Sequence, residues 1–138
     1  MKASFFALIF MSLAAALYAQ PIPAAAQKAF AAQFPTAKHV RWEREKNGDF
    51  EAECQIAGVE TSVVYSAEGE WKETETEISA KDLPAAVMAA FAKAFPAATL
   101  KEAEKIDRNK GETQYEIEFT HNRKAQEAVF SADGSLIK

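Results

Sequence analysis

The side chains that most often carry catalysis or bind metals are scarce in this chain. It contains one cysteine, Cys54, and two histidines, His39 and His121. A cysteine acts as a nucleophile or a redox sensor when a base lies beside it and solvent reaches it, and a zinc site needs several ligands at short spacing. His39 is expected in a strand beside Arg41, and His121 at a hairpin turn. Neither has a cysteine or a second histidine at ligand spacing, so the sequence predicts no metal site.

Motifs for other chemistries are also missing from the sequence. No serine stands in a Gly-x-Ser-x-Gly elbow, and no glycine-rich loop suits a phosphate or a dinucleotide. We therefore expect no catalytic residue and no cofactor. Catalysis remains one functional interpretation, and two binding interpretations are given at the end of this subsection. An enzyme would require His39, Cys54 or a buried glutamate to converge with other polar groups in one cleft.

Paired carboxylates are the other groups that could do chemistry. Glu51 and Glu53 alternate with inward-facing residues, and so do Glu116 and Glu118. Such pairs support acid–base catalysis when one carboxyl is buried and its pKa rises. On the solvated face of a strand they form an acidic surface instead, which suits a basic patch on a protein partner. We expect the acidic surface, and these four glutamates are candidate partner-binding residues.

Aromatic residues supply much of the binding energy in protein interfaces. Trp42, Tyr65 and Trp71 are the candidates here. Trp42 alternates with Arg41 and Glu43, which indicates the core face of a strand. Trp71 follows a glycine hairpin and could face either side, so it joins the candidate partner-binding residues.

An internal repeat organises the elements that carry these residues. Residues 22–35 read IPAAAQKAFAAQFP, and residues 83–96 read LPAAVMAAFAKAFP. Further on, FEAEC at 50–54 matches YEIEF at 115–119, and YSAEG at 65–69 matches FSADG at 130–134. The offset grows from 61 to 65, so the second copy has four more residues, around 109–111. The alignment places Cys54 opposite Phe119, which indicates a small core residue.

Each copy predicts one helix followed by four strands. Pro23 and Pro84 open the helices, where a missing N–H is harmless, and Phe-Pro pairs at 34–35 and 95–96 end them. Apolar residues then recur at every second position, as in strands with one packed and one solvated face. The expected strands lie at about 38–45, 50–56, 60–66 and 70–78, and at about 99–107, 113–119, 124–131 and 135–138.

The predicted fold class is α+β, with two tandem repeats of one helix and a four-stranded antiparallel sheet. The repeats span residues 20–78 and 79–138, and the helices pack on one sheet face. A unit of nearly 60 residues is marginal alone. The two copies are therefore expected to share a core or a continuous sheet.

The first residues predict export. Lys2 precedes an uncharged, largely apolar run from residue 3 to residue 19, which is typical of a secretory signal peptide. The run has 17 residues, fewer than the ~20 that span a bilayer. Residues 1–19 are the predicted signal peptide, with cleavage after Ala16 or Ala19; an uncleaved anchor is the alternative. We expect a periplasmic or secreted protein without a stable membrane anchor after cleavage.

The charge balance bears on the partner. The chain has 16 basic and 20 acidic residues, and removal of Lys2 with the signal peptide leaves 15 basic residues. Nucleic acids and anionic membranes recruit surfaces rich in lysine and arginine. An acidic mature chain therefore disfavours both as partners.

The doubled order of motifs resembles the PepSY-like family of exported Gram-negative proteins, also described as β-lactamase-inhibitor-like. The resemblance covers the whole mature chain. It is carried by Pro23, Phe30, Phe34, Pro35, Val40, Trp42, Phe50, Tyr65, Gly69 and Trp71, and by Leu83, Pro84, Phe91, Phe95, Pro96, Tyr115, Phe130 and Gly134. The family is similar in fold to secreted inhibitors whose sheet face grips a target protein, which implies a binding role with inhibition of an enzyme as one form of it.

The leading interpretation is a non-catalytic exported protein that contacts a protein partner through its open sheet face. The alternative is a periplasmic binder of a small ligand or a cell-wall fragment, held in a pocket between helix and sheet. A deep apolar pocket there would favour the alternative.

Overall fold

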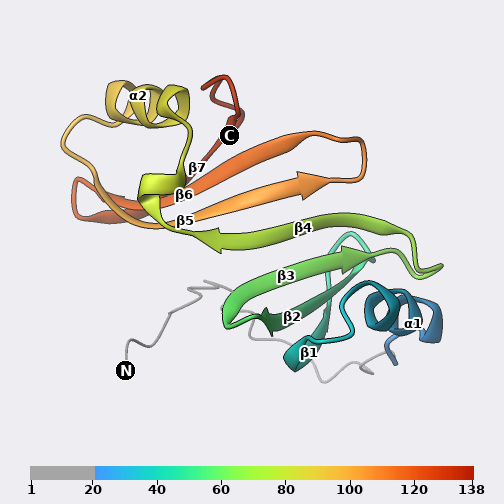
Figure 1. Ribbon diagram of the computed structural model, residues 1–138. Coiled ribbons are helices and arrows are strands. Elements are labelled where there is room, and N and C mark those ends of the chain that lie inside the picture. Colours follow the sequence, from blue (N-terminus) through green and yellow to red (C-terminus); the bar gives the residue numbers. More distant parts are fainter. Residues whose placement is uncertain (1–20) are drawn as a thin grey trace.

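The strands form one continuous sheet. The computed structural model of the protein describes residues 21–138, so the predicted signal peptide lies outside the described residues. Seven antiparallel strands follow one another in sequence order across the sheet, as Figure 1 shows. They are β1 Lys38–Arg44, β2 Phe50–Ile56, β3 Val59–Tyr65, β4 Trp71–Ile78, β5 Thr99–Arg108, β6 Thr113–His121 and β7 Lys124–Ser131.

Two short helices cover this sheet, α1 at Ala24–Gln33 and α2 at Ala85–Ala94. Each follows a proline, Pro23 or Pro84, whose fixed φ suits the start of a helix. Each ends at a phenylalanine that precedes a proline and leaves the helical region, with φ/ψ of −127°/62° at Phe34 and −129°/66° at Phe95. The predicted helices are therefore present at both places.

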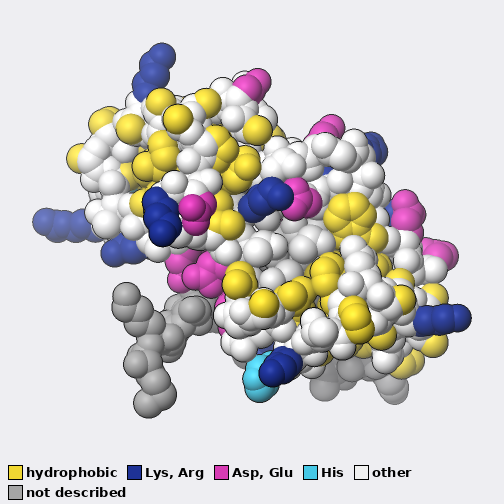
Figure 2. All heavy atoms as spheres, in the orientation of Figure 1, with side chains coloured by type: hydrophobic (Ala, Val, Ile, Leu, Met, Phe, Trp, Pro, Cys, Tyr) yellow, Lys and Arg dark blue, Asp and Glu magenta, His cyan; other side chains and the backbone are white. Residues whose placement is uncertain are grey.

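The hydrophobic core is divided into two clusters, one under each helix. Phe30 of α1 packs with Ala52, Cys54, Val63 and Tyr65 of the sheet. The second cluster joins α2 to β5, β6 and β7 and contains Leu83, Val87, Phe91, Ala103, Ile117, Phe119, Ala128 and Phe130. Figure 2 shows hydrophobic side chains gathered in two groups around the two helices. The halves therefore have separate cores.

The sheet itself joins the halves, through pairing of β4 with β5. Thr76 lies opposite Lys105, and Ile78 opposite Ala103. A short 3-10 helix, η1 at Ala80–Asp82, leads from β4 to α2. Of the two expected arrangements, a shared core or a continuous sheet, the structure has the continuous sheet.

The prediction of two four-stranded sheets is wrong in one element. Residues 135–138 form no strand; Leu136 makes an isolated antiparallel bridge to Phe130, and the N–H of Ile137 donates to the carbonyl of Val129. The corresponding strand of the first half, β4, has neighbours on both sides. In the second half no further strand follows within the described residues, so the last four residues pair on one side only.

Equivalent close contacts recur in the two halves. A Cβ built on Gly69 would lie 2.7 Å from the carbonyl oxygen of Ala25, and one on Gly134 would lie 2.6 Å from that of Ala86. Both glycines also have positive φ, of +85° and +89°. Each hairpin turn thus presses its glycine against the first turn of its helix, where no side chain fits.

Candidate functional site: the open face of the sheet

Pairing register and burial assign every strand residue to one of two faces. In β2, Phe50, Ala52 and Cys54 are buried beneath α1, and Glu51 and Glu53 between them point the other way. We call the sheet face opposite both helices the open face. The predicted alternation in β2 is therefore present in the structure.

The central strand adds three more carboxylates to the open face. Glu73, Glu75 and Glu77 of β4 lie in register with open-face residues of β3 and β5, while Thr74 and Thr76 face the helices. The sequence predicts a strand at about 70–78. In the structure this strand is present as β4 and connects the two halves.

The second half continues the acidic surface across β5, β6 and β7. Glu104 of β5 lies opposite Glu116 of β6, and Glu118 of β6 lies between Glu102 and Glu127 of its neighbours. The carboxylates of the open face are Glu43, Glu51, Glu53, Glu60, Glu73, Glu75, Glu77, Glu102, Glu104, Glu116, Glu118 and Glu127. The open face is strongly acidic.

Cationic side chains pair with only a few of these carboxylates. Arg41 pairs with Glu53 at one edge of the sheet. Lys138 pairs with Glu127 at the other, with 2.5 Å between Nζ and Oε1.

A third pair lies nearer the middle, at one end of the strands. The guanidinium of Arg108 lies 2.5 Å from the carboxylate of Glu73, with Arg108 Nε also donating to Gln114. No ion pair within residues 21–138 involves Glu51, Glu75, Glu104 or Glu116.

Burial raises the pKa values of the central carboxyls, and the charges of neighbouring carboxylates add to the rise. Burial raises the pKa of Glu75 to about 8, and the neighbouring charges of Glu104, Glu73, Glu116 and Glu51 add to the rise. Burial likewise raises the pKa of Glu104 to about 7. The pKa values of Glu51, Glu102, Glu116 and Glu118 are raised too, in each case mainly by burial. The centre of the open face therefore holds protons at neutral pH.

Uncharged buried side chains lie among the central carboxyls. Ser62 of β3 and Ile106 of β5 flank Glu75 in the register. Ser62 is 2% exposed and Ile106 1%. Ser62 Oγ makes no hydrogen bond within the described residues, although its nearby hydroxyl partly offsets the rise in the pKa of Glu51.

The structure brings four of the five predicted partner-binding residues together. Glu51, Glu53, Glu116 and Glu118 share the open face. Trp71 lies on the other face, where it packs against the core cluster under α1 and its Nε1 donates to Thr74 Oγ1 at 2.9 Å.

Glu75 and Glu104, whose pKa values are raised most on this face, are not among the residues predicted from the sequence. Glu73, Glu75 and Glu77 do alternate with threonines, which is a strand signal. Threonine is neither clearly apolar nor charged, so the alternation alone does not say which side is packed.

Cys54 is in the core, as the repeat alignment predicts. It is 2% exposed, and burial raises the pKa of its thiol, with the charge of Glu60 adding to the rise. A buried thiol with a raised pKa is a poor nucleophile. Within residues 21–138, no group of three histidine, cysteine or acidic side chains could hold a metal ion.

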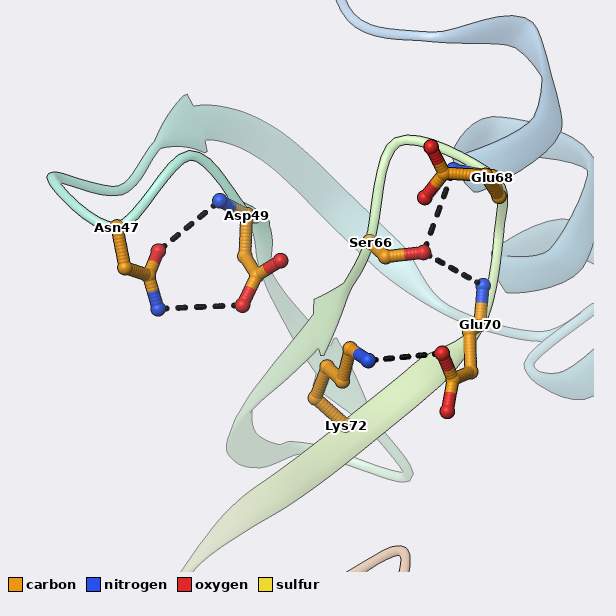
Figure 3. A network of polar contacts seen from close by, with 6 residues as sticks. All are labelled: Asn47, Asp49, Ser66, Glu68, Glu70 and Lys72. Carbon is orange, nitrogen blue, oxygen red and sulfur yellow. Dashed lines mark hydrogen bonds and ion pairs between the residues drawn. The ribbon is translucent and has the colours of Figure 1, made fainter.

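A polar cavity of about 350 Å³ lies at one end of the strands. It is bounded by the β1–β2 turn, the start of β4 and the β5–β6 turn, where the second half has its additional residues. Asn47 and Asp49 are held together in the first turn, and Lys72 pairs with Glu70 beside it, as Figure 3 shows. This cavity is lined mainly by charged residues and lies away from both helices, so it is not the apolar helix–sheet pocket that the alternative interpretation requires.

The fold and the open face define a class of protein: two helices on one side of a continuous antiparallel sheet, with an acidic sheet face left uncovered. The chain belongs to the PepSY-like family, because the family model described as "Putative beta-lactamase-inhibitor-like, PepSY-like" matches residues 12–60 and 49–138. A comparison with curated proteins found no match. No helix among residues 21–138 has the length and apolarity to cross a membrane.

Solved structures from Bacteroides share this fold. One, described as "putative periplasmic proteins" from Bacteroides eggerthii DSM 20697, is 21% identical, with 86% of this chain and 88% of that chain covered and a TM-score of 0.78. A DUF2874 family protein from Bacteroides uniformis ATCC 8492 is 22% identical, with 84% and 86% covered and a TM-score of 0.75. A BLIP-like protein from Bacteroides fragilis NCTC 9343 is 27% identical, with 86% and 85% covered and a TM-score of 0.69.

Proposed function

We propose that the chain is an exported, non-catalytic binding protein that contacts a basic patch of a protein partner through its open face. The observation that carries this proposal is the row of carboxylates across all seven strands, with few cations among them. Charge complementarity speeds association and selects partners. A protein partner fits a broad sheet face better than a small molecule does.

Export and the tandem arrangement belong to the same proposal. The N-terminal segment has the pattern of a signal peptide, and a structural neighbour is described as periplasmic. The equivalent helix–glycine contacts at Gly69 and Gly134 support two copies of one unit, residues 20–78 and 79–138. Restraint of an enzyme is the form of binding that the family description suggests.

The test is capture of a partner from periplasmic extract by the mature protein, at low and high salt. Screening shortens the reach of charge interactions from roughly 10 Å at 0.1 M salt to roughly 3 Å at 1 M. A partner bound through the open face is therefore expected at low salt and lost at high salt. A variant with Glu51→Gln, Glu53→Gln, Glu116→Gln and Glu118→Gln should lose it at low salt too.

A matched control changes the net charge equally at exposed positions away from this face. Glu68→Gln, Glu70→Gln, Asp82→Asn and Asp133→Asn together remove four acidic charges in the same way. This variant should capture the partner as the unchanged protein does. Equal loss in both variants, or capture that salt does not weaken, would show that the open face is not the contact surface.

A further inference from the structure

Ser62 is an unusual residue for the centre of a sheet. It lies opposite Glu75 across the β3–β4 ladder and opposite Glu53 across the β2–β3 ladder, so its side chain shares the open face with both carboxylates. Its hydroxyl oxygen is buried without a hydrogen-bond partner within the described residues. A buried polar group without a partner destabilises a fold. The hydroxyl lies near enough to Glu51 to offset part of the rise in the pKa of that carboxyl, so the part of the hydroxyl that the structure leaves unused is its lone pairs.

Glu75 lies beside this hydroxyl, and Glu104 lies on the far side of Glu75; neither carboxyl makes an ion pair within the described residues. Glu77 lies opposite Glu104, which puts Glu104 diagonal to Glu75 across the β4–β5 ladder. Diagonal neighbours in a sheet are ~7–8 Å apart at their backbones, within reach of long side chains. Burial raises the pKa of Glu75 most, and among the neighbouring charges that of Glu104 raises it most.

Charged groups on every neighbouring element surround this centre. Glu51 lies on β2, Glu73 and Glu77 on β4 itself, and Glu116 on β6. Two cations are near. Arg108 on β5 is paired with Glu73. Lys138 is paired with Glu127, and the charges of Glu116 and Glu75 also raise the pKa of Lys138. The surroundings therefore remain acidic after these pairs are formed.

We propose that Ser62, Glu75 and Glu104 form a receptor for one cationic side chain of the partner, a lysine ammonium or an arginine guanidinium, and that its binding releases a proton from the open face. This inference rests on the proposed function, because the same face contacts the partner. Both cations are donors only, with three N–H groups on lysine and five on arginine. One hydroxyl oxygen and two carboxylates are acceptors that match either group.

Proton release follows from the state of Glu75. With a pKa of about 8, this carboxyl is mostly protonated and neutral at pH 7. A cation that settles beside it favours the ionised form and lowers its pKa, so the proton leaves to solvent as the cation binds. Affinity therefore rises with pH and levels off above pH 8. For one such proton the gain from pH 7 to pH 8.5 is about tenfold.

The experiment is titration calorimetry of the mature protein with octalysine and, separately, octaarginine, at constant low ionic strength and at pH 7.0 and 8.5. Measurement in two buffers of different ionisation enthalpy gives the number of protons released. We expect binding that salt weakens, an affinity about tenfold higher at pH 8.5, and proton release at pH 7. The peptide that binds identifies the cation as an ammonium or a guanidinium.

Three variants separate the receptor from the general charge of the face. Glu75→Gln keeps the shape of the neutral acid and should lose most of the pH dependence. Glu77→Gln, two residues along the same strand, removes an equal charge and should weaken binding while keeping the pH dependence. Ser62→Ala should weaken binding about fivefold, the effect of one hydrogen bond, with the pH dependence retained.

Two results would overturn the receptor and leave the proposed function standing. In the first, binding weakens with salt but does not depend on pH. In the second, binding has the same pH dependence in Glu75→Gln as in Glu77→Gln. No binding of either peptide at low salt would overturn both. Thermal unfolding of each variant under the same conditions confirms that it is folded. Because glutamine matches the protonated carboxyl in shape, the unfolding temperature of Glu75→Gln at pH 7 should be at least as high as that of the unchanged protein.

Discussion

The carbonyl oxygen of Ala25 occupies the space in which a side chain at Gly69 would have to lie, and Ala86 stands in the same relation to Gly134. These contacts tie the end of one hairpin in each half to the first turn of its helix. They hold each helix at a defined place over the sheet.

Substitution of either glycine by alanine should therefore be strongly destabilising. Positive φ costs an alanine about 1–2 kcal/mol, and the clash with helix backbone adds about 1–3 kcal/mol. Gly58 is the matched control, since its φ of +81° is similar but no atom lies within 4 Å of a Cβ built there. In urea unfolding, the free energy of unfolding of Gly69→Ala and of Gly134→Ala should be well below that of Gly58→Ala. Equal losses at all three positions would contradict the contacts.

The stability of the protein should fall as pH rises from 5.5 to 8.5. The folded state raises the pKa of Glu75 to about 8 and of Glu104 to about 7 from the usual 4.5, so it binds their protons more tightly than the unfolded chain does. The resulting stabilisation is complete below pH 4.5 and is lost as pH passes through 7 and 8. With allowance for solvent, the loss is about 2–4 kcal/mol.

Urea unfolding at several pH values measures this loss. The double variant Glu75→Gln and Glu104→Gln should flatten the profile, because glutamine does not titrate. A profile that is already flat in the unchanged protein would mean that these carboxyls are well solvated.

Ser62→Ala should stabilise the protein by about 1 kcal/mol, because it removes a buried hydroxyl that has no partner within the described residues. Ser66→Ala is the matched comparison. Its hydroxyl accepts hydrogen bonds from the N–H groups of Glu68 and Glu70, both at 3.2 Å, as Figure 3 shows. Its removal should destabilise by about 1 kcal/mol. Opposite signs in chemical unfolding are the expected result, and a loss of stability in Ser62→Ala would contradict it.

Cys54 should react slowly with thiol reagents in the folded protein. The side chain is 2% exposed and burial raises the pKa of its thiol, so both access and thiolate are limited. Reaction with Ellman's reagent should be at least about 100-fold slower than in denaturant, since it awaits local opening. Fast labelling of the native protein would instead indicate an accessible thiol and support the enzyme interpretation.

Most secondary structure could be predicted from the sequence because local rules decide it. The Phe-Pro pairs end the helices, and the alternation in residues 50–56 and 113–119 marks strands with one packed face. The exception is residues 135–138, for which the repeat predicts a strand. A strand needs a ladder of paired residues, and this segment makes one isolated bridge, to Phe130, with further backbone hydrogen bonds to Val129 and Ser131 at its ends.

The sheet face on which Trp71 lies could not be predicted from local sequence patterns either. A register shift lies between Val64 and Tyr65, and it places Trp71 opposite Tyr65 on the helix face. Alternation counted along the chain cannot show such a shift, because it depends on both strands.

The amino-acid sequence by itself determined the repeat, the two helices, the core position of Cys54 and the alternation that lines carboxylates along β2 and β6. Only the tertiary structure decided that β4 and β5 pair, which turns two sets of glutamates into one surface. The perturbation of Glu75 arises from that pairing. Its pKa depends on residues from β2, β4, β5 and β6 that are far apart in the chain, and charge interactions depend on distance in space.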